Sequence, residues 1–382
     1  MAGLSQQDLV KLVQSVFPRF EDDRVLGILV DVPRTPDRDN PDWKIRRAMA
    51  VDWHRRFQSG VSDIPLEAVR LLAYPDVGSN NADLPDELIV VTGELPPSAE
   101  RLGAAGERKT TSTIFSETQI FLAPTEYSTT APLKNAAARY GFRAATMPGF
   151  SEVMIPALRI DYGEVGRRVA LLKKKLDRAE SAAVEFDVEG AGSCHVLFDL
   201  RFRNAHMSSG RFPEKGTAGN LPSGETYIVP YEGEHGEASR TSGVLPVEIG
   251  GEIVDFTIEN NRAMDAEGAG PAAREEQDRL TREPAYGNMA ELGFGVLGDF
   301  GIKPVGEILL DEKLGLHIAF GRSDHFGGRI GPKDFSSPSE VVHLDRIYIP
   351  AVQPRVRVRS IVLFYPEGPA ETVMQDGRYL VF

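Results

Sequence analysis

The stretch RVLGILVDV, residues 24–32, determines the fold class of the first half of the chain. It is a short apolar run rich in β-branched residues, which is typical of a buried strand. A helical pattern follows in WKIRRAMAVDWHRRF, residues 43–57. Further helices and short strands are expected at 5–17, 69–75, 88–92, 120–123, 134–140 and 161–183. This alternation predicts an α/β domain with a mostly parallel sheet.

The pattern changes after residue 183. Short strand-like runs separated by Gly, Pro, Asn and Ser then dominate, at 183–188, 194–202, 226–229, 244–249 and 252–258. One helix is expected at 270–282, and a hairpin around 366–368 ends the chain. A single core seldom exceeds ~250–300 residues. The 382 residues are therefore expected to form two domains, an N-terminal α/β domain over 1–183 and a β-rich domain of α+β type over 184–382.

Composition excludes several classes of function. The formal net charge is −13 and the isoelectric point is near 5.2, which argues against a nucleic-acid partner. No apolar run approaches the ~20 residues that span a bilayer, so no membrane association is expected. The N-terminal segment is an amphipathic helix without the features of a secretion signal. A single cysteine, Cys194, excludes an intrachain disulfide and fits a reduced cytoplasm.

The run VVHLDRIYI, residues 341–349, holds the strongest local signal for chemistry. It is rich in strand-forming residues, and side chains at positions i and i+2 of a strand point to the same face. His343 and Asp345 can therefore converge on one metal ion. The same spacing also fits a mutual hydrogen bond or a solvated strand face, and that alternative stays open on the sequence alone.

Three further segments contribute ionisable groups. DEKLGLHIAFG, residues 311–321, places Glu312 five residues before His317, and the two converge only if Gly315 bends the chain. Glu225 follows a Pro-Ser-Gly turn at the head of a strand, and Glu291 lies among apolar residues and glycines with no local basic partner. Each acid has a structural alternative as a surface or turn residue. Together with His343 and Asp345 they form a mixed oxygen and nitrogen set suited to divalent metals.

These segments occur in the same order and with similar internal spacing in a known family. The sequence resembles the thermophilic metalloaminopeptidases of the aminopeptidase T and S type, and also the branch of that family that includes 2,5-dihydroxypyridine 5,6-dioxygenase. The match is best over 220–346. In the N-terminal half, three segments are more similar to the dioxygenase-like branch: DVPRTPDRDNPDWKIRR (31–47), TEYSTTAPL (125–133) and GFRAATMPGF (141–150).

The resemblance implies roles for these residues. The implied metal ligands are Glu225, Glu312, His317, His343 and Asp345, and Glu291 is implied as a ligand or general base. It also implies one or two divalent ions per chain (zinc, manganese, cobalt or iron), a homodimer, and a site in a cavity between the domains.

The chain departs from the family pattern at one position near His317. The peptidases carry a tyrosine seven residues after the histidine that matches His317, and this chain has Asp324 there. His325, which follows it, is either an alternative catalytic donor or ligand, or a loop histidine.

Three functions follow as expectations. The first is a metal-dependent hydrolase of a peptide or amide, which uses all six matched residues and resembles the aminopeptidases. The second is a mononuclear non-haem iron dioxygenase that cleaves a ring, with His317, His343 and Asp345 as its 2-His-1-carboxylate face. The third is a catalytically silent protein that binds a peptide or small molecule on the same fold.

Overall fold

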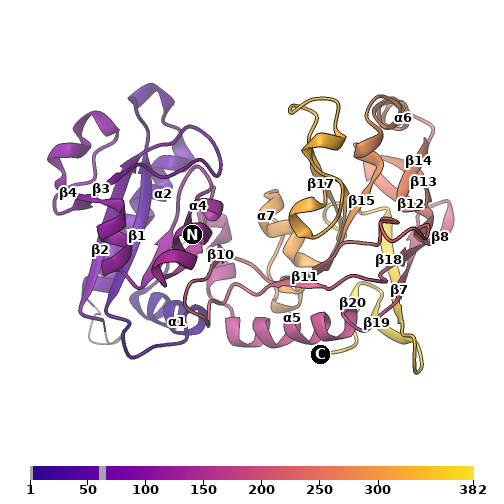
Figure 1. Ribbon diagram of the computed structural model, residues 1–382, viewed down its shortest axis with the longest axis horizontal. Coiled ribbons are helices and arrows are strands. Elements are labelled where there is room, and N and C mark those ends of the chain that lie inside the picture. Colours follow the sequence, from indigo (N-terminus) through magenta and orange to yellow (C-terminus); the bar gives the residue numbers. More distant parts are fainter. Residues whose placement is uncertain (1–2, 60–65) are drawn as a thin grey trace. The chain divides into compact units, whose positions relative to one another are not determined.

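The structure is a computed structural model that describes residues 3–59 and 66–382. The chain divides into two compact units (Figure 1). The first unit comprises residues up to Gly166 together with Gly210–Ser223, and the second comprises Arg167–Ser209 together with Gly224–Phe382. The chain therefore returns to the first unit once before it completes the second.

The first unit is built on a seven-stranded sheet in the order β10-β6-β5-β1-β2-β3-β4. Its strands are β1 (Val25–Val32), β2 (Ala68–Pro75), β3 (Glu87–Val91), β4 (Gly106–Thr110), β5 (Ile120–Ala123), β6 (Arg143–Thr146) and β10 (Ala218–Asn220). The five strands from β10 to β2 run parallel, whereas β3 and β4 are joined antiparallel. Every residue of β1 is buried, which explains why this strand has no polar alternation.

Helices cover this sheet and complete its core. They are α1 (Gln6–Val16), α2 (Pro41–Ser59), α3 (Thr111–Glu117) and α4 (Thr130–Tyr140), and α5 (Tyr162–Leu176) begins in this unit. The first begins at Ser5, which accepts a hydrogen bond from the backbone of Asp8 in a capping box. Phe115 of α3 and Leu133 of α4 pack with Phe121 of β5 in one apolar cluster. The observed class of this unit is mixed α/β.

Two sheets form the second unit. One has eight strands in the order β14-β13-β12-β8-β7-β18-β19-β20, and the other has five, in the order β17-β16-β15-β11-β9. The eight strands are β7 (Ser181–Val188), β8 (Gly192–Asp199), β12 (Ser242–Ile249), β13 (Glu252–Glu259), β14 (Arg262–Glu267), β18 (Val356–Phe364), β19 (Glu371–Gln375) and β20 (Arg378–Tyr379). The five are β9 (His206–Ser208), β11 (Glu225–Ile228), β15 (Met289–Gly295), β16 (Leu316–Gly321) and β17 (His343–Tyr348).

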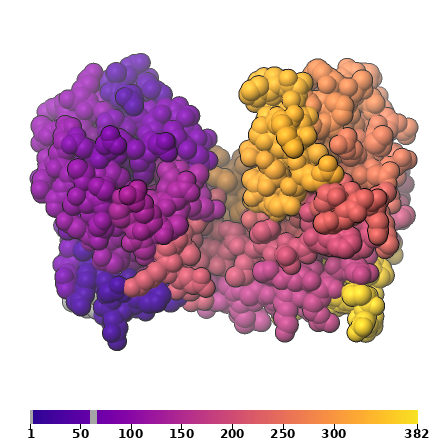
Figure 2. Space-filling view, viewed as in Figure 1, coloured from indigo at the N-terminus to yellow at the C-terminus, as the bar shows by residue number. Residues whose placement is uncertain are grey.

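The two sheets of this unit meet through apolar side chains. Phe320 of β16 lies 5.0 Å, ring centre to ring centre, from Phe256 of β13. Helices α6 (Pro271–Arg282) and α7 (Ile308–Asp311) connect strands of the unit. The connection between β16 and β17, golden in Figure 2, lies at the surface. One face of the five-stranded sheet therefore packs against the eight-stranded sheet through apolar side chains such as Phe320. The opposite face carries the polar side chains of the candidate site.

The predicted domain boundary at residue 183 differs from the observed division. The expected helix over 161–183 ends at Leu176, and β7 already begins at Ser181. The chain passes from the first unit to the second within α5, because Gly166 is the last residue of the first segment and Arg167 already belongs to the second unit. A single boundary also omits Gly210–Ser223, which returns to place β10 beside β6.

Candidate metal centre

The candidate site lies on one face of the five-stranded sheet. Residues directly opposite each other in antiparallel strands point to the same side. The register pairs Glu225 with Gly295, Gly293 with His317, and Ala319 with Asp345. Glu291 also pairs with Ala319, next to a bulge between Met289 and Glu291. Strand pairing therefore aligns the acids and histidines of four neighbouring strands on one face.

Two glycines of β15 make room on this face. A Cβ atom at Gly293 would lie 1.9 Å from Nε2 of His317, so the imidazole occupies the space above that glycine. A Cβ atom at Gly295 would lie 2.2 Å from the carbonyl carbon of Lys313. The absence of both side chains lets the His317 ring and the Glu312–Lys313 backbone lie directly against β15.

Glu225, Glu291 and His317 form a group that could hold a metal ion. Each offers a ligand atom, these atoms all lie within 4.8 Å of one another, and all three residues are buried. Nε2 of His317 lies 3.0 Å from Oε1 of Glu291 and 3.4 Å from Oε2 of Glu225. Oε2 of Glu225 is buried and has no hydrogen-bond partner among the described residues. A buried acceptor without a donor is costly, so this atom fits a cation.

His343 and Asp345 adjoin this group through the second oxygen of Glu291. Nε2 of His343 lies 3.4 Å from Oε2 of Glu291 and 3.6 Å from Oδ1 of Asp345. Nδ1 of the same ring lies 2.7 Å from the carbonyl oxygen of Arg322. A hydrogen bond from Nδ1 to that carbonyl fixes the ring and leaves Nε2 facing the site, as is common for metal-binding histidines.

Glu312 lies beside the group, and its carboxylate binds a lysine. The ammonium of Lys313 donates to Oε1 of Glu225 at 2.6 Å and also to Oε1 of Glu312. Burial, against the opposing attraction of Lys313, raises the pKa of Glu312 to about 7. Lys313 was not identified from the sequence. The local sequence offers one signal for this residue, a lysine within an apolar segment directly after Glu312. Its other partner, Glu225, is 88 positions away, so no local pattern indicates that contact.

The acidic groups hold protons on the histidines when no metal is bound. Burial opposes the charged form of His317, but the hydrogen bond to Glu291 and nearby negative charge raise its pKa to about 9. Burial also opposes the charge on His343, yet contacts with Asp345 and Glu291 raise its pKa to about 11. The same contacts overcome burial and lower the pKa of Glu291. A metal ion must therefore displace these protons.

His325 lies next to the site and outside the group of three. It belongs to the 3-10 turn Asp324–Phe326, and its ring centre is 5.2 Å from that of His343. Burial and the positive charge of His343 lower the pKa of His325 to about 4. In the metal-free protein the ring is therefore neutral at neutral pH.

A tyrosine on the same face was also missed. Tyr227 follows Glu225 by two positions in β11, so both side chains point to the same side. Its ring packs against His206 and Phe326, with ring centres 5.4 and 4.7 Å away. Burial and the charges of Glu291 and Glu225 raise the pKa of its hydroxyl. The i, i+2 spacing from Glu225 was the signal available in the sequence.

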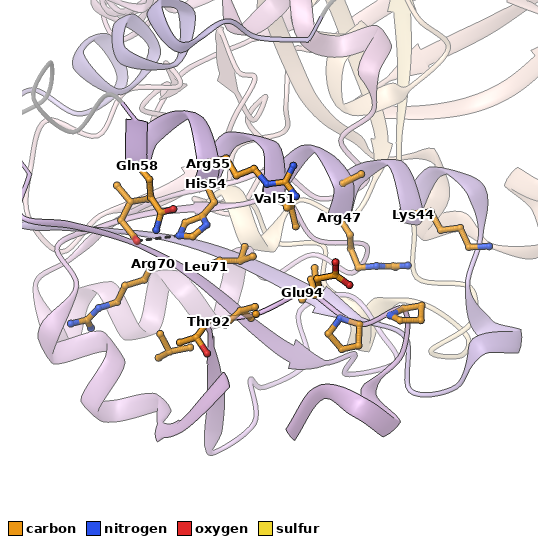
Figure 3. A pocket seen from close by; sticks show the side chains of 18 residues that line it. Lys44, Arg47, Val51, His54, Arg55, Gln58, Arg70, Leu71, Thr92 and Glu94 are labelled. Carbon is orange, nitrogen blue, oxygen red and sulfur yellow. Dashed lines mark hydrogen bonds between the residues drawn. The ribbon is translucent and has the colours of Figure 1, made fainter. Parts of the chain in front are cut away.

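A separate cavity lies in the first unit. It has a volume of about 900 Å³ and lies between α2 and strands β2 and β3, with Lys44, Arg47, His54 and Arg70 around it (Figure 3). Glu94 is the one carboxylate among its lining residues. This set lacks the clustered acids and histidines that bind metals. The chemistry therefore points to the five-stranded sheet of the second unit and not to this cavity.

Comparison with known proteins places the fold. No known family profile matches the sequence, and no curated protein matches it. Solved structures are similar to this chain, among them the following two. The 2,5-dihydroxypyridine dioxygenase of Pseudomonas putida KT2440 has a TM-score of 0.57 and 15% identity, covering 98% of this chain and 96% of that chain. Wild-type AmpT, aminopeptidase T, of Thermus thermophilus has a TM-score of 0.53 and 15% identity, covering 98% and 99%.

The likeness is one of fold. An aminopeptidase and a dioxygenase share this architecture with the chain, so both expected reactions fit the fold. The choice between them depends on the arrangement of the site residues. Over the described part of the chain, no helix has the length and apolar character required to cross a bilayer.

Proposed function

We propose that this protein is a metal-dependent hydrolase that acts on a peptide or amide bond. The observation that carries this proposal is the convergence of Glu225, Glu291 and His317. The resemblance to aminopeptidases gives each of these residues a role at a metal. The dioxygenase hypothesis uses His317, His343 and Asp345, and leaves the two glutamates without a necessary function.

The donor set suits hydrolysis. Two carboxylates and one imidazole provide three protein ligands, and catalytic metal sites commonly combine three such ligands with a water molecule. A bound divalent ion would lower the pKa of that water and polarise the scissile carbonyl. His343, which lies near the other oxygen of Glu291, and Asp345 beside it would complete the coordination of this ion.

The proton of the attacking water needs an acceptor. Glu291 contacts both histidines and its pKa is lowered, so it fits a ligand better than a base. Glu312 is the better base, because burial raises its pKa to about 7 and a general base works best near the operating pH. Its carboxylate is held beside Glu225 by the shared ammonium of Lys313.

The test begins with metal-free protein. After reconstitution with zinc, manganese or cobalt, we expect release of the N-terminal residue from a panel of aminoacyl anilides and short peptides. A chelator and the His317→Ala substitution should each abolish the activity together with metal binding. Glu87→Gln, which alters an exposed ion pair with Arg108 in the first unit, serves as the matched control and should change neither. A protein that binds no divalent metal would exclude the proposal.

A ring-cleaving dioxygenase is the second candidate. It is favoured by Asp324 at the position where the peptidases carry a tyrosine, and by the facing pair of His343 and Asp345. Its test is reconstitution with ferrous iron and measurement of dioxygen consumption with dihydroxypyridines. Iron-dependent consumption without peptide cleavage would replace the hydrolase proposal. Binding of a peptide without any change in its mass would support the catalytically silent alternative.

A further inference from the structure

Lys313 is a buried cation within the proposed metal centre. The residue is 4% exposed, and its ammonium donates to Oε1 of Glu225 at 2.6 Å and to Oε1 of Glu312. Both acids are residues that the resemblance to the aminopeptidases implies as metal ligands. A buried charge is stable only when it is paired, so these two carboxylates hold the ammonium in place.

Glu225 divides its two oxygens between different neighbours. Oε1 binds the ammonium of Lys313, whereas Oε2 is buried, lies 3.4 Å from Nε2 of His317 and has no hydrogen-bond partner among the described residues. A carboxylate in this arrangement is suited to join two cations. One of them, the ammonium, belongs to the chain itself, and the free oxygen is left for one metal ion.

The backbone keeps Lys313 in this position. The Lys313 carbonyl lies against Gly295, where a Cβ atom would come within 2.2–2.5 Å of it. The amide of Gly295 also donates to the carbonyl of Gly315 at 2.8 Å. The segment from Glu312 to Gly315 is therefore anchored on β15 at both ends. The ammonium cannot move to solvent without leaving the buried Glu225 and the partly buried Glu312 without this partner.

We propose that the ammonium of Lys313 takes the position that a second divalent ion would need between Glu225 and Glu312, so that the centre holds one divalent ion per chain. This inference rests on the proposed metal-dependent function and specifies its metal count. A zinc-like ion requires carboxylate oxygens at ~2.0–2.2 Å, and an ammonium that already binds both acids excludes it. Lys313 also supplies positive charge that balances the acids without a second metal.

The test counts metal ions in the full-length protein and in Lys313→Met. This substitution removes the charge and keeps a long apolar side chain. Lys303→Met, at an exposed lysine of the same unit, is the matched control. Each protein is freed of metal, equilibrated with excess Mn²⁺, passed through a desalting column and analysed by elemental analysis. Electron paramagnetic resonance then distinguishes an isolated Mn²⁺ from the coupled pair expected for ions ~3.5–4 Å apart.

We expect one ion per chain with an isolated signal in the wild type and in Lys303→Met, and two ions with a coupled signal in Lys313→Met. Two ions in the wild type would overturn the inference and leave the proposed function intact. One ion in Lys313→Met with an unchanged near-ultraviolet circular dichroism spectrum would also overturn it. If the variant does not fold, the wild-type count alone decides. No ion in the wild type would overturn the proposed function and the inference with it.

Discussion

The imidazole of His317 lies over Gly293 on the neighbouring strand, where a Cβ atom would come within 1.9 Å of Nε2. The two residues are directly paired in the register of β15 and β16. This relationship connects the strand pairing to the chemistry of the site. His317 can reach Glu291 and Glu225 because the position between them carries no side chain.

Gly293→Ala should therefore impair metal binding specifically. The new methyl group must displace the His317 ring, which moves Nε2 away from Glu291. We expect metal affinity, measured by calorimetric titration of the metal-free protein, to fall by about 10–100-fold. Gly93→Ala is the control, because a Cβ atom there meets only an ordinary contact at 3.7 Å. Unchanged affinity in Gly293→Ala would show that His317 is not a ligand.

The expected strands and helices follow from local patterns where burial imposes those patterns. The run at 24–32 is apolar because β1 (Val25–Val32) is buried along its whole length, and this apolar run made the strand predictable. The strand expected at 183–188 lies within β7 (Ser181–Val188), whereas the helix expected up to residue 183 ends at Leu176. Pairing with β8 and β18 determines that strand, and such long-range contacts override local propensity.

The site was predictable to the extent that it is local. The i, i+2 spacing places His343 and Asp345 on one face, and the structure brings them within 3.6 Å. The link between Lys313 and Glu225 spans 88 positions, and no spacing rule relates residues so far apart. The grouping of Glu225 with Glu291 and His317 likewise depends on the order of β11, β15 and β16 in the sheet. No local sequence pattern indicates that order.

Metal binding should depend on pH with a defined sign. The pKa of His317 is about 9 in the folded metal-free protein, so near neutral pH the ion must displace a proton. We expect affinity to rise by about tenfold per pH unit, up to about pH 9, for each histidine proton that the ion displaces. Calorimetry in buffers of different ionisation enthalpy should detect the released proton. An affinity independent of pH in this range would contradict protonation of the site.

The stability of the metal-free protein should change in the opposite direction. Because the pKa of His317 rises on folding from 6.5 to about 9, its stabilising contribution is complete below pH 6.5 and is lost as the pH rises through 9. The pKa of Glu312 is also raised on folding, to about 7, so its contribution to stability is likewise lost as the pH rises, but mostly below pH 7. The stabilities of the wild type and the variant are therefore compared above pH 7. The free energy of unfolding by urea should decrease there in the wild type, and the decrease should be smaller in His317→Gln.

Glu225→Gln should destabilise the protein as well as weaken metal binding. The substitution removes the negative partner that lies 2.6 Å from the buried ammonium of Lys313. Loss of one partner from a buried pair costs about 3–5 kcal/mol, which urea unfolding of the metal-free protein would measure. The exposed pair of Glu87 and Arg108 is the reference, and Glu87→Gln should cost no more than about 1 kcal/mol. Equal effects of the two substitutions would refute the role of Lys313 as a buried, paired cation.

The two compact units predict which fragment of the first half folds alone. A fragment that ends at residue 183 lacks β10 and so exposes the edge of β6. It also retains Val169 and Leu172 of α5, which are buried in the full chain and lie in the part of α5 assigned to the second unit. Exposed strand edges and apolar surface promote aggregation. We expect this fragment to aggregate during gel filtration.

A fragment of residues 1–166 joined by a short Gly-Ser linker to 210–223 should instead be monomeric and melt cooperatively. It restores β10, and it restores the carbonyl of Phe212, which accepts a hydrogen bond from the buried guanidinium of Arg143 at 3.1 Å. Arg143 also pairs with Asp23 at 2.6 Å, so the returning segment closes a buried polar network. If both fragments melt alike by circular dichroism, residues 210–223 are not part of the first folding unit, and the boundary at residue 183 is sufficient.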